Sequence, residues 1–328
     1  MNINYLRENV NSALSLQLNN YCSTISEIDE QLIPIANSLK EFISDGKRFR
    51  PIFALLGFIG AYGELSPNVF QAASALEFLQ ASALIHDDLM DRSDTRRGKP
   101  AIHKQFGDAA AILIGDLALV WNEQAVHDSG LSSVSLNGIH DVMRTELMAG
   151  QFLDVYEQTQ KTYSVERSLK IARYKSGKYS IERPLHFGAA MANPTNLETY
   201  YGIYSEYGLP LGEAFQLRDD LLGVFGDPNE TGKPAGDDLR EGKRTALVAY
   251  AYDRGDLATK KLIESKLGTE DVDNLADAIS QSGAVVHVED LIEKLAEEAL
   301  DAINRQELNS EVKPLLVEMV SIVTKRSR

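Results

Sequence analysis

Apolar residues recur at three- and four-residue spacing along most of this chain, which is the pattern of helices with one buried face. The clearest example is 70–88, where neither glycine nor proline interrupts the pattern. The stretch 108–127 is apolar almost all round, which predicts a helix inside a bundle rather than on its surface. Further helical patterns cover 139–159, 164–181, 205–225, 243–265 and 290–307.

Turn-forming residues separate these stretches, at Ser66-Pro67, at Asp227-Pro228-Asn229 and in the glycine-containing run 232–236. No strand-like alternation recurs at regular spacing, and no fixed-period repeat or low-complexity linker divides the chain. The pattern therefore predicts an all-α protein, folded as a single domain over residues 1–328.

Composition narrows the class of protein. The net charge of −15 and the isoelectric point near 4.9 argue against binding to nucleic acid or to anionic lipid. A single cysteine, Cys22, excludes an intrachain disulfide and a cysteine-rich metal site, and it suits a reducing compartment. The first residues lack the pattern of a signal peptide, and no apolar run reaches the roughly 18 residues of a membrane span. We predict a cytoplasmic protein with no membrane span.

The stretch ALIHDDLMDRSDTRRGKP, residues 83–100, crowds carboxylates at the end of an apolar helix. Asp87 and Asp91 are four residues apart and therefore share one helical face, with Asp88 beside them. Like charges at this spacing destabilise an isolated helix, whereas Mg²⁺ is commonly held by one or two carboxylates plus substrate phosphates. A solvated acidic helix end is the alternative interpretation.

A second cluster strengthens the case for metal. In FQLRDDLLGVFGD, residues 215–227, Asp219 and Asp220 are adjacent, and Gln216 can share their face. Two such helices facing each other could hold two or three Mg²⁺ ions on a diphosphate. The arginines directly behind the first cluster fit this interpretation, because the planar guanidinium pairs bidentately with phosphate.

These clusters belong to a longer series that resembles the trans-isoprenyl diphosphate synthases, or polyprenyl synthetases. The series also resembles the short-chain geranylgeranyl diphosphate synthases of actinobacterial type. The matching segments are GKRFRP (46–51), LIHDDLMDRSDTRRG (84–98), GQFLD (150–154), YKSG (174–177), FQLRDD (215–220) and GKPAGDDLREGKRT (232–245). The resemblance implies a large helical bundle of the isoprenoid synthase fold with a deep central cavity, typically a homodimer. It also implies Mg²⁺-dependent head-to-tail condensation of isopentenyl diphosphate with an allylic diphosphate.

The resemblance also assigns roles by position. Asp87 and Asp91 would bind two Mg²⁺ ions and Asp219 a third, with Asp88 and Asp220 in support. The allylic diphosphate would be bound by Arg96, Lys175 and Lys233, with Lys243 closing later. Isopentenyl diphosphate would be bound without metal by Lys47, Arg50 and Arg97, beside Gln80, and approached by the terminal Lys325 and Arg326. The Gln216 side chain, the Ser176 hydroxyl and the Lys175 carbonyl would shield the allylic cation.

This arrangement needs no protein base. Preorganised Mg²⁺ and cationic side chains stabilise the charge on the departing diphosphate, and the double bond of isopentenyl diphosphate attacks the allylic cation. A proton is then lost to the released diphosphate. Accordingly, the sequence shows no persuasive catalytic triad or paired general acid and base.

Two positions depart from the family pattern. Gly223 stands where many relatives carry a third aspartate of the second motif, so the metal load should rest on Asp219, with weaker Mg²⁺ affinity as a consequence. Ser176 replaces a common threonine and keeps its hydroxyl.

Product length depends on the helix before Asp87, along which the growing chain should run. Ala83 and Ser82, four and five residues earlier, are small and leave room, whereas Leu79 and Leu76 lie one and two turns further down. Phe58 and Trp121 on neighbouring helices could also meet the chain end. We predict geranylgeranyl diphosphate, with twenty carbons; the small residues could equally serve close helix packing.

Other functions remain open at this stage. A longer-chain polyprenyl or a farnesyl diphosphate synthase would share every catalytic residue. A class I terpene cyclase would share the fold but has little use for the cations of a second diphosphate site. A non-catalytic subunit of a heteromeric synthase usually lacks one aspartate cluster, and this sequence has both.

Overall fold

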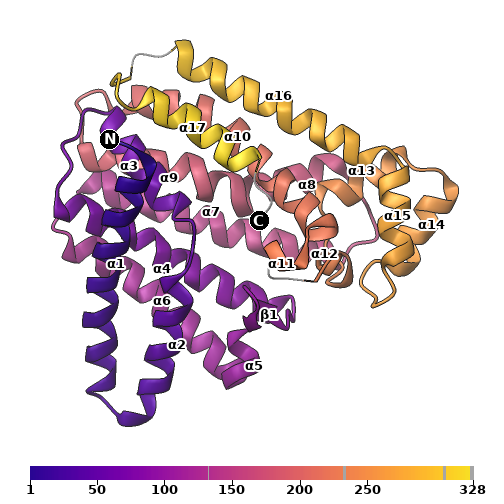
Figure 1. Ribbon diagram of the computed structural model, residues 1–328, viewed down its shortest axis with the longest axis horizontal. Coiled ribbons are helices and arrows are strands. Elements are labelled where there is room, and N and C mark those ends of the chain that lie inside the picture. The colour runs from indigo at the N-terminus through magenta and orange to yellow at the C-terminus, as the bar shows by residue number, and fades with distance from the viewer. Residues whose placement is uncertain (132, 232–233, 306–307, 326–328) are drawn as a thin grey trace.

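The computed structural model describes residues 1–131, 133–231, 234–305 and 308–325. This part of the chain is almost entirely helical (Figure 1), which confirms the all-α prediction. The elements up to residue 158 are α1 (Ile3–Ser26), η1 (Glu30–Leu32), α2 (Ile33–Ser44), α3 (Phe49–Gly60), α4 (Pro67–Met90), β1 (Thr95–Arg96), β2 (Lys99–Pro100), α5 (Ile102–Phe106), α6 (Asp108–Asp128) and α7 (Val134–Gln158). Those that follow are α8 (Val165–Ala172), η2 (Arg173–Glu182), α9 (Arg183–Ala192), α10 (Leu197–Phe225), α11 (Pro228–Thr231), α12 (Asp237–Arg240), α13 (Ala246–Arg254), α14 (Leu257–Lys266), α15 (Asp273–Gln281), α16 (Ala284–Arg305) and α17 (Lys313–Thr324).

The long helices lie where the apolar pattern predicts them. α4 begins after Ser66, with Pro67 in its first turn, where a missing N–H breaks no hydrogen bond. The predicted helix 243–265 is instead two helices. Gly255 ends α13, and the Asp256 side chain accepts a hydrogen bond from a backbone N–H in the first turn of α14, so a new helix starts there.

A small hairpin that the helical pattern did not predict follows the first aspartate cluster. β1 and β2 pair antiparallel across a two-residue loop, Arg97-Gly98. Both loop residues have positive φ, 54° and 73°, as a tight hairpin turn requires. The hairpin turns the chain sharply just behind the carboxylates, so that Arg96 lies against Asp88 and Arg97 reaches the carbonyls of Phe42 and Asp45.

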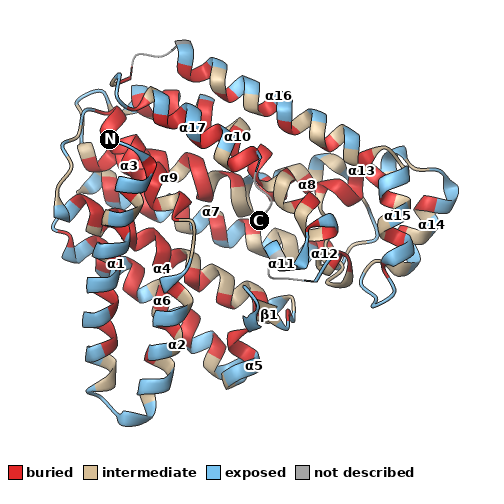
Figure 2. Cartoon of the chain, viewed as in Figure 1, coloured by how far each residue is buried: buried red, intermediate tan, exposed pale blue. Residues whose placement is uncertain are grey.

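The helices pack around two connected hydrophobic clusters. α4 packs along α1 and α6, α3 packs on α9, and α10 packs along η2 and α16. One cluster spans the helices from α1 to α10 together with α16 and α17, and the other lies among α10 and α13 to α16. Buried faces turn inward, and the outer faces of α1, α2 and α16 are exposed (Figure 2). Because α10 contributes to both clusters, it supports the single-domain organisation, which stays a prediction.

α6 is less buried than its apolar sequence predicts. Leu113 and Val120 are 68% and 61% exposed, so the expectation of a helix wholly inside the bundle is wrong. Among the described helices, α6 has the length and hydropathy to cross a membrane, with 44% of its most apolar window buried. It packs along α4, and a core helix of a soluble protein passes the same test.

A buried polar chain ties three of these helices together. Asn122 of α6 donates a hydrogen bond to the Ala75 carbonyl of α4 and lies 2.8 Å from the ring of His140 on α7. Burial, with the Arg144 guanidinium nearby, lowers the pKa of His140 to about 3. On α9, burial and Arg183 likewise lower the pKa of His186 to about 3.

Each of these two histidines should therefore favour unfolding in mild acid. Both histidines are neutral in the folded chain down to low pH, whereas in the unfolded chain each takes up a proton below about pH 6.5. The unfolding free energy should drop by up to about 1.4 kcal/mol per pH unit for each histidine as the pH falls from about 6.5. Urea unfolding between pH 7.5 and 5.5 measures the slope. His140→Gln should remove the contribution of one histidine to this slope. An unchanged slope in that variant would contradict the lowered pKa of His140.

Candidate active site

The first aspartate cluster lies at the carboxyl end of α4. Asp87 and Asp88 are in its last turn, and Asp91 caps the helix, its backbone N–H bonding to the Asp87 carbonyl at 2.8 Å. Gln80, Ala83 and Asp87 are all partly exposed, at the three- and four-residue spacing of one helical face. This face of α4 is therefore partly accessible, whereas the predicted chain-length residues Ser82 and Leu79 are buried.

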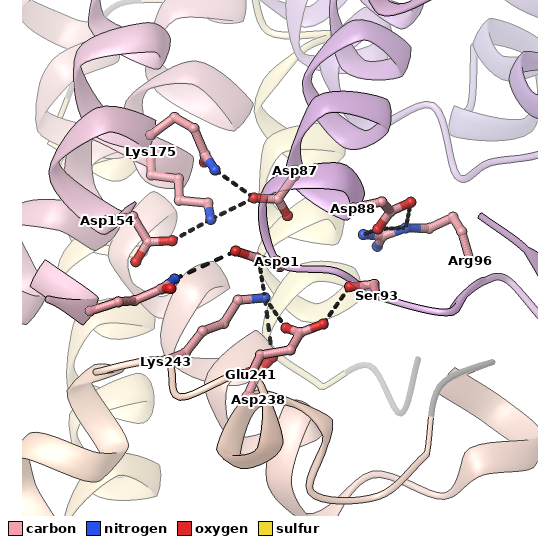
Figure 3. A network of polar contacts seen from close by, with 12 residues as sticks. Asp87, Asp88, Asp91, Ser93, Arg96, Asp154, Lys175, Asp238, Glu241 and Lys243 are labelled. Carbon is pink, nitrogen blue, oxygen red and sulfur yellow. Dashed lines mark hydrogen bonds and ion pairs between the residues drawn. The ribbon is translucent and has the colours of Figure 1, made fainter. Parts of the chain in front are cut away.

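Lys175 of η2 holds the first of these carboxylates. Its Nζ lies 2.9 Å from Asp87 Oδ1 and 2.6 Å from Asp154 Oδ2 of α7 (Figure 3). Gln151, also on α7, donates to the same Asp87 oxygen at 2.7 Å. Burial by itself would raise the pKa of Asp87, but Lys175 and the other cations nearby outweigh it and lower that pKa well below its usual range.

Lys243 holds the other end of the cluster. Its Nζ lies 2.8 Å from Asp91 Oδ2, 2.5 Å from Glu241 Oε2 and 3.6 Å from Asp238 Oδ1 (Figure 3). Burial opposes its charge, but these carboxylates outweigh that effect and raise the pKa of Lys243 well above its ordinary value. Burial and the nearby Asp87 carboxylate raise the pKa of Asp91, although Lys243 opposes them. The segment after the second aspartate motif is thus closed directly onto the first.

The element that carries Lys175 is a π-helix, η2, where the sequence predicted the continuation of a regular helix. A side chain on Gly150 of α7 would collide with the backbone of Lys175, and one on Gly212 of α10 would collide with the Gly177 carbonyl. Glycine therefore permits α7, η2 and α10 to approach at backbone distance. Ser176 lies in η2 between these contacts and is partly exposed.

The second motif lies on α10, where its two aspartates differ. Asp220 is fully buried: it accepts hydrogen bonds from Gln216 at 2.7 Å and from the Ala246 backbone N–H at 3.1 Å. Burial raises the pKa of Asp220 to about 7, with Asp238 and Asp219 adding to the effect. Asp219 is partly exposed. Asp220 is thus built into the start of α13, and Asp219 is the more accessible carboxylate of the pair.

Gly223, the departure from the family pattern, lies against Asp238. A side chain at Gly223 would begin where the Asp238 carboxylate now lies. The space of the missing third aspartate is therefore filled by a carboxylate from α12.

The predicted diphosphate ligands divide into two groups. Arg96 is turned toward the buried Asp88, and its Nε lies 3.0 and 3.1 Å from the two carboxylate oxygens. In the second group, Arg50 NH2 donates to Ser180 Oγ at 2.7 Å, and its guanidinium lies 4.1 Å from the Tyr179 ring centre. The Tyr179 hydroxyl in turn donates to Gln80.

Of the other predicted diphosphate ligands, some lie in the described part of the chain and some do not. Arg97 NH1 donates to the carbonyls of Phe42 and Asp45, and Lys47 Nζ lies 5.6 Å from the Phe49 ring centre. Lys233 and Arg326 lie outside the described residues, and Lys325 is exposed at the end of α17.

Several residues of the site carried no assigned role in the sequence. Gln151 and Asp154 lie in the matched segment GQFLD, and Asp238 and Glu241 lie in GKPAGDDLREGKRT. The sequence thus pointed to these segments but did not indicate what each of these residues contacts. Tyr179 lies five residues beyond the start of YKSG and had no local signal. Their roles follow from contacts between segments far apart in the chain.

The carboxylates do not form a metal cage by themselves. Within the described ranges, no three His, Cys, Asp or Glu side chains lie close enough together to hold a metal ion. Lys175 and Lys243 lie between the acids instead. Oxygen donors in pairs, with further ligands supplied by a phosphate-bearing substrate, are a usual setting for Mg²⁺.

Comparison with known proteins agrees with this geometry. The sequence profile of the polyprenyl synthetase family matches residues 34–282. The geranylfarnesyl diphosphate synthase of Aeropyrum pernix is 34% identical over 88% of this chain and 93% of its own length. The geranylgeranyl diphosphate synthase of Sulfolobus acidocaldarius is 29% identical over 99% of this chain and 98% of its own length.

Solved structures agree in fold over the whole chain. The crystal structure of geranylgeranyl pyrophosphate synthase from Corynebacterium glutamicum, complexed with isoprenyl diphosphate and magnesium, has a TM-score of 0.93 and 38% identity, covering 99% of this chain and 100% of that one. With the aspartate clusters and their lysines in the family's order, this chain belongs to the polyprenyl synthetase family and is a trans-prenyltransferase.

Proposed function

We propose that this enzyme condenses isopentenyl diphosphate with allylic diphosphates to geranylgeranyl diphosphate, using three Mg²⁺ ions. The observation that carries the proposal is the contact of Lys243 with Asp91, which closes the segment after the second motif onto the first. A site closed in this way has carboxylates on two sides and lysines between them. It suits a metal-bound diphosphate held between α4 and α10.

The donor set fits Mg²⁺. Asp87 and Asp91 on α4 and Asp219 on α10 offer oxygen ligands, and the related Corynebacterium enzyme was crystallised with magnesium and isoprenyl diphosphate. Bound Mg²⁺ would stabilise the negative charge that develops on the departing diphosphate. Asp88 and Asp220 support rather than ligate, since Arg96 and the Ala246 N–H already occupy their oxygens.

Lys175 and Lys243 would pair first with the carboxylates and then with the diphosphate. Before substrate binds, Lys175 and Lys243 neutralise the buried carboxylates; with substrate bound, their N–H groups donate to diphosphate oxygens, together with Arg96 and Lys233. The allylic carbon–oxygen bond breaks, and its electron pair leaves on the diphosphate. The double bond of isopentenyl diphosphate then forms the new carbon–carbon bond, and the proton lost from C2 passes to the released diphosphate.

Three groups on η2 and α10 shield the cation. Gln216 donates its amide N–H to Asp220, which turns its carbonyl oxygen away from that carboxylate. Ser176 and the Lys175 carbonyl lie in the π-helix opposite α4. These oxygens would stabilise positive charge without acting as bases, because amide and hydroxyl oxygens are very weakly basic.

Product length follows from the accessible face of α4. Ala83 shares this face with Asp87, about 6 Å along the helix, whereas Ser82 and Leu79 are fully buried. One turn below Ser82, Phe78 packs on Trp121 and both pack on Tyr21, with ring centres 5.5 to 6.1 Å apart. We propose that the chain passes Ala83 and stops above this aromatic group.

Purified protein with Mg²⁺, labelled isopentenyl diphosphate and dimethylallyl, geranyl or farnesyl diphosphate should give a dominant twenty-carbon alcohol after dephosphorylation. Ala83→Val, Ala83→Leu and Ala83→Phe should shorten the product in that order, because larger side chains block the face nearer the metals. Chromatography and mass spectrometry size the products. A twenty-five-carbon product, as in the Aeropyrum relative's name, would reject the proposed floor, and no product with any primer would reject the synthase itself.

The filled space at Gly223 generates a separate prediction. Gly223→Asp restores the common motif in sequence, yet its side chain would displace Asp238 and with it α12. We expect a weaker Mg²⁺ affinity, by about tenfold or more, since a positioned group displaced by about 1 Å can cost that much. Calorimetric titration of Mg²⁺ in the presence of inorganic pyrophosphate measures it.

Two further variants serve as controls for the effect of Gly223→Asp on Mg²⁺ affinity. Combining Gly223→Asp with Asp238→Gly should recover much of the affinity, because the collision is removed and one carboxylate remains. Gly138→Asp adds the same side chain on α7, where nothing lies within 4 Å of the new Cβ, and should change nothing. Tighter Mg²⁺ binding by Gly223→Asp alone would show that the two carboxylates coexist.

We also propose that the enzyme is a homodimer. α6 and α7 expose large apolar side chains: Leu113 and Val120 on one, Phe152 and Met148 on the other, at 68%, 61%, 70% and 40%. The other face of α7 carries Gln151 and Asp154 of the site. A second copy covering the apolar face would bury these side chains and stiffen the helix behind the metals.

Light scattering should then give about twice the chain mass of 36.2 kDa. Leu113→Glu combined with Phe152→Glu should yield the monomer, because buried unpaired carboxylates oppose association. Leu16→Glu on α1, where the leucine is 64% exposed, is the matched control and should leave the mass unchanged. A monomeric wild type, or a dimer that survives the double substitution, would contradict the proposed interface.

A further inference from the structure

Arg48, in the middle of GKRFRP, differs from the two cations beside it. Lys47 and Arg50 are partly exposed, whereas Arg48 is 3% exposed. Its φ of 61° is the left-handed conformation, which is uncommon for any residue but glycine, and it is the residue that precedes α3. Such a conformation persists only where surrounding contacts fix it. The contacts of the side chain therefore explain why the chain turns here.

Each nitrogen of the Arg48 guanidinium donates a hydrogen bond within the protein. Nε donates to Asn11 Oδ1 at 2.8 Å, NH1 to Glu77 Oε2 at 2.6 Å and to the Asp45 carbonyl at 3.1 Å, and NH2 to the Ser44 carbonyl at 2.6 Å. Glu77 is itself buried, in α4. The fork joins α1, the end of α2 and α4, so its donors are engaged before any substrate arrives.

The same loop holds a cation of the second diphosphate site. The Asp45 carbonyl that accepts from Arg48 also accepts from Arg97 NH1, at 2.6 Å. A Cβ at Gly46 would lie 3.0 Å from Arg48 NH1, 3.5 Å from Arg97 NH2 and 3.6 Å from Glu77 Oε2. Residues 44–47 are thus wrapped around the Arg48–Glu77 pair, and Arg97 docks on the outside of that loop.

We propose that the buried Arg48–Glu77 pair positions Lys47 and Arg97 to bind the diphosphate of isopentenyl diphosphate. The inference rests on the proposed function and adds a positioning residue to its metal-free site. Glu77 cancels the charge of Arg48, so the pair fixes geometry and leaves the net positive charge to the residues that face the substrate. Lysine could not replace Arg48, because one ammonium cannot reach three directions as a planar fork does.

The expected signature is a selective one. Arg48→Lys keeps the charge and loses the fork, so the loop should shift and the KM for isopentenyl diphosphate should rise by about tenfold or more. The KM for the allylic diphosphate and the Mg²⁺ requirement should change by less than about twofold, because Arg96, Lys175 and Lys243 do not contact the loop. Calorimetry of isopentenyl diphosphate binding should show the same loss without turnover.

Two variants separate positioning from stability. Arg48→Met with Glu77→Leu removes both buried charges, which is often tolerated by the fold, so the thermal midpoint should stay near that of the wild type while the KM for isopentenyl diphosphate remains raised. Arg167→Lys, in the Arg167–Glu157 pair between α8 and α7, is the matched control and should raise neither KM. A proportionate loss for both substrates, or no change in either KM, would overturn the inference.

Failure of the inference can be told from failure of the proposed function. A wild-type enzyme that neither binds isopentenyl diphosphate nor elongates any primer rejects the function. A wild type that does both, with Arg48 variants that bind isopentenyl diphosphate as tightly, rejects only the role of Arg48.

Discussion

The contacts between Asp87 and Lys175 and between Asp91 and Lys243 are the interactions on which the site depends. Carboxylates buried at the end of α4 would repel one another and lose their hydration, a cost that only opposite charge can offset. The two lysines come from η2 and from the segment before α13, so neutralising the acids also fixes where these elements lie. The ion pairs that neutralise the carboxylates therefore also hold the elements of the active site together.

This compensation shapes how the enzyme meets its substrate. The lysines that neutralise the carboxylates are also predicted ligands of the diphosphate, and the carboxylates are predicted ligands of Mg²⁺. On the proposed function, metal and diphosphate would enter as a pair and exchange partners with groups already in place, which would keep the charge balance. A preorganised site of this kind needs little rearrangement when negative charge moves onto the leaving group.

Much of this could be predicted from the sequence because it is local. The spacing of apolar residues in 70–88 fixed α4, and the four-residue interval between Asp87 and Asp91 fixed their shared face. The π-helix of η2, the docking of Asp238 against Gly223 and the burial of Arg48 could not be predicted, because each depends on a segment distant in the chain. Residues 108–127 were wrongly predicted to lie wholly inside the bundle for a related reason. An apolar helix has the same sequence pattern whether the rest of the chain surrounds it or leaves one of its faces exposed.

The net charge of −15 makes these long-range pairings necessary. An acidic protein repels a diphosphate at a distance, so its affinity must come from cations presented at short range. Lone arginines on flexible side chains would lose conformational entropy on binding. Here Arg96 is fixed by Asp88, and Arg97 by the Asp45 carbonyl, which the buried Arg48 also holds. These side chains are therefore ordered before substrate arrives, so an anion that binds them would lose less conformational entropy in fixing them.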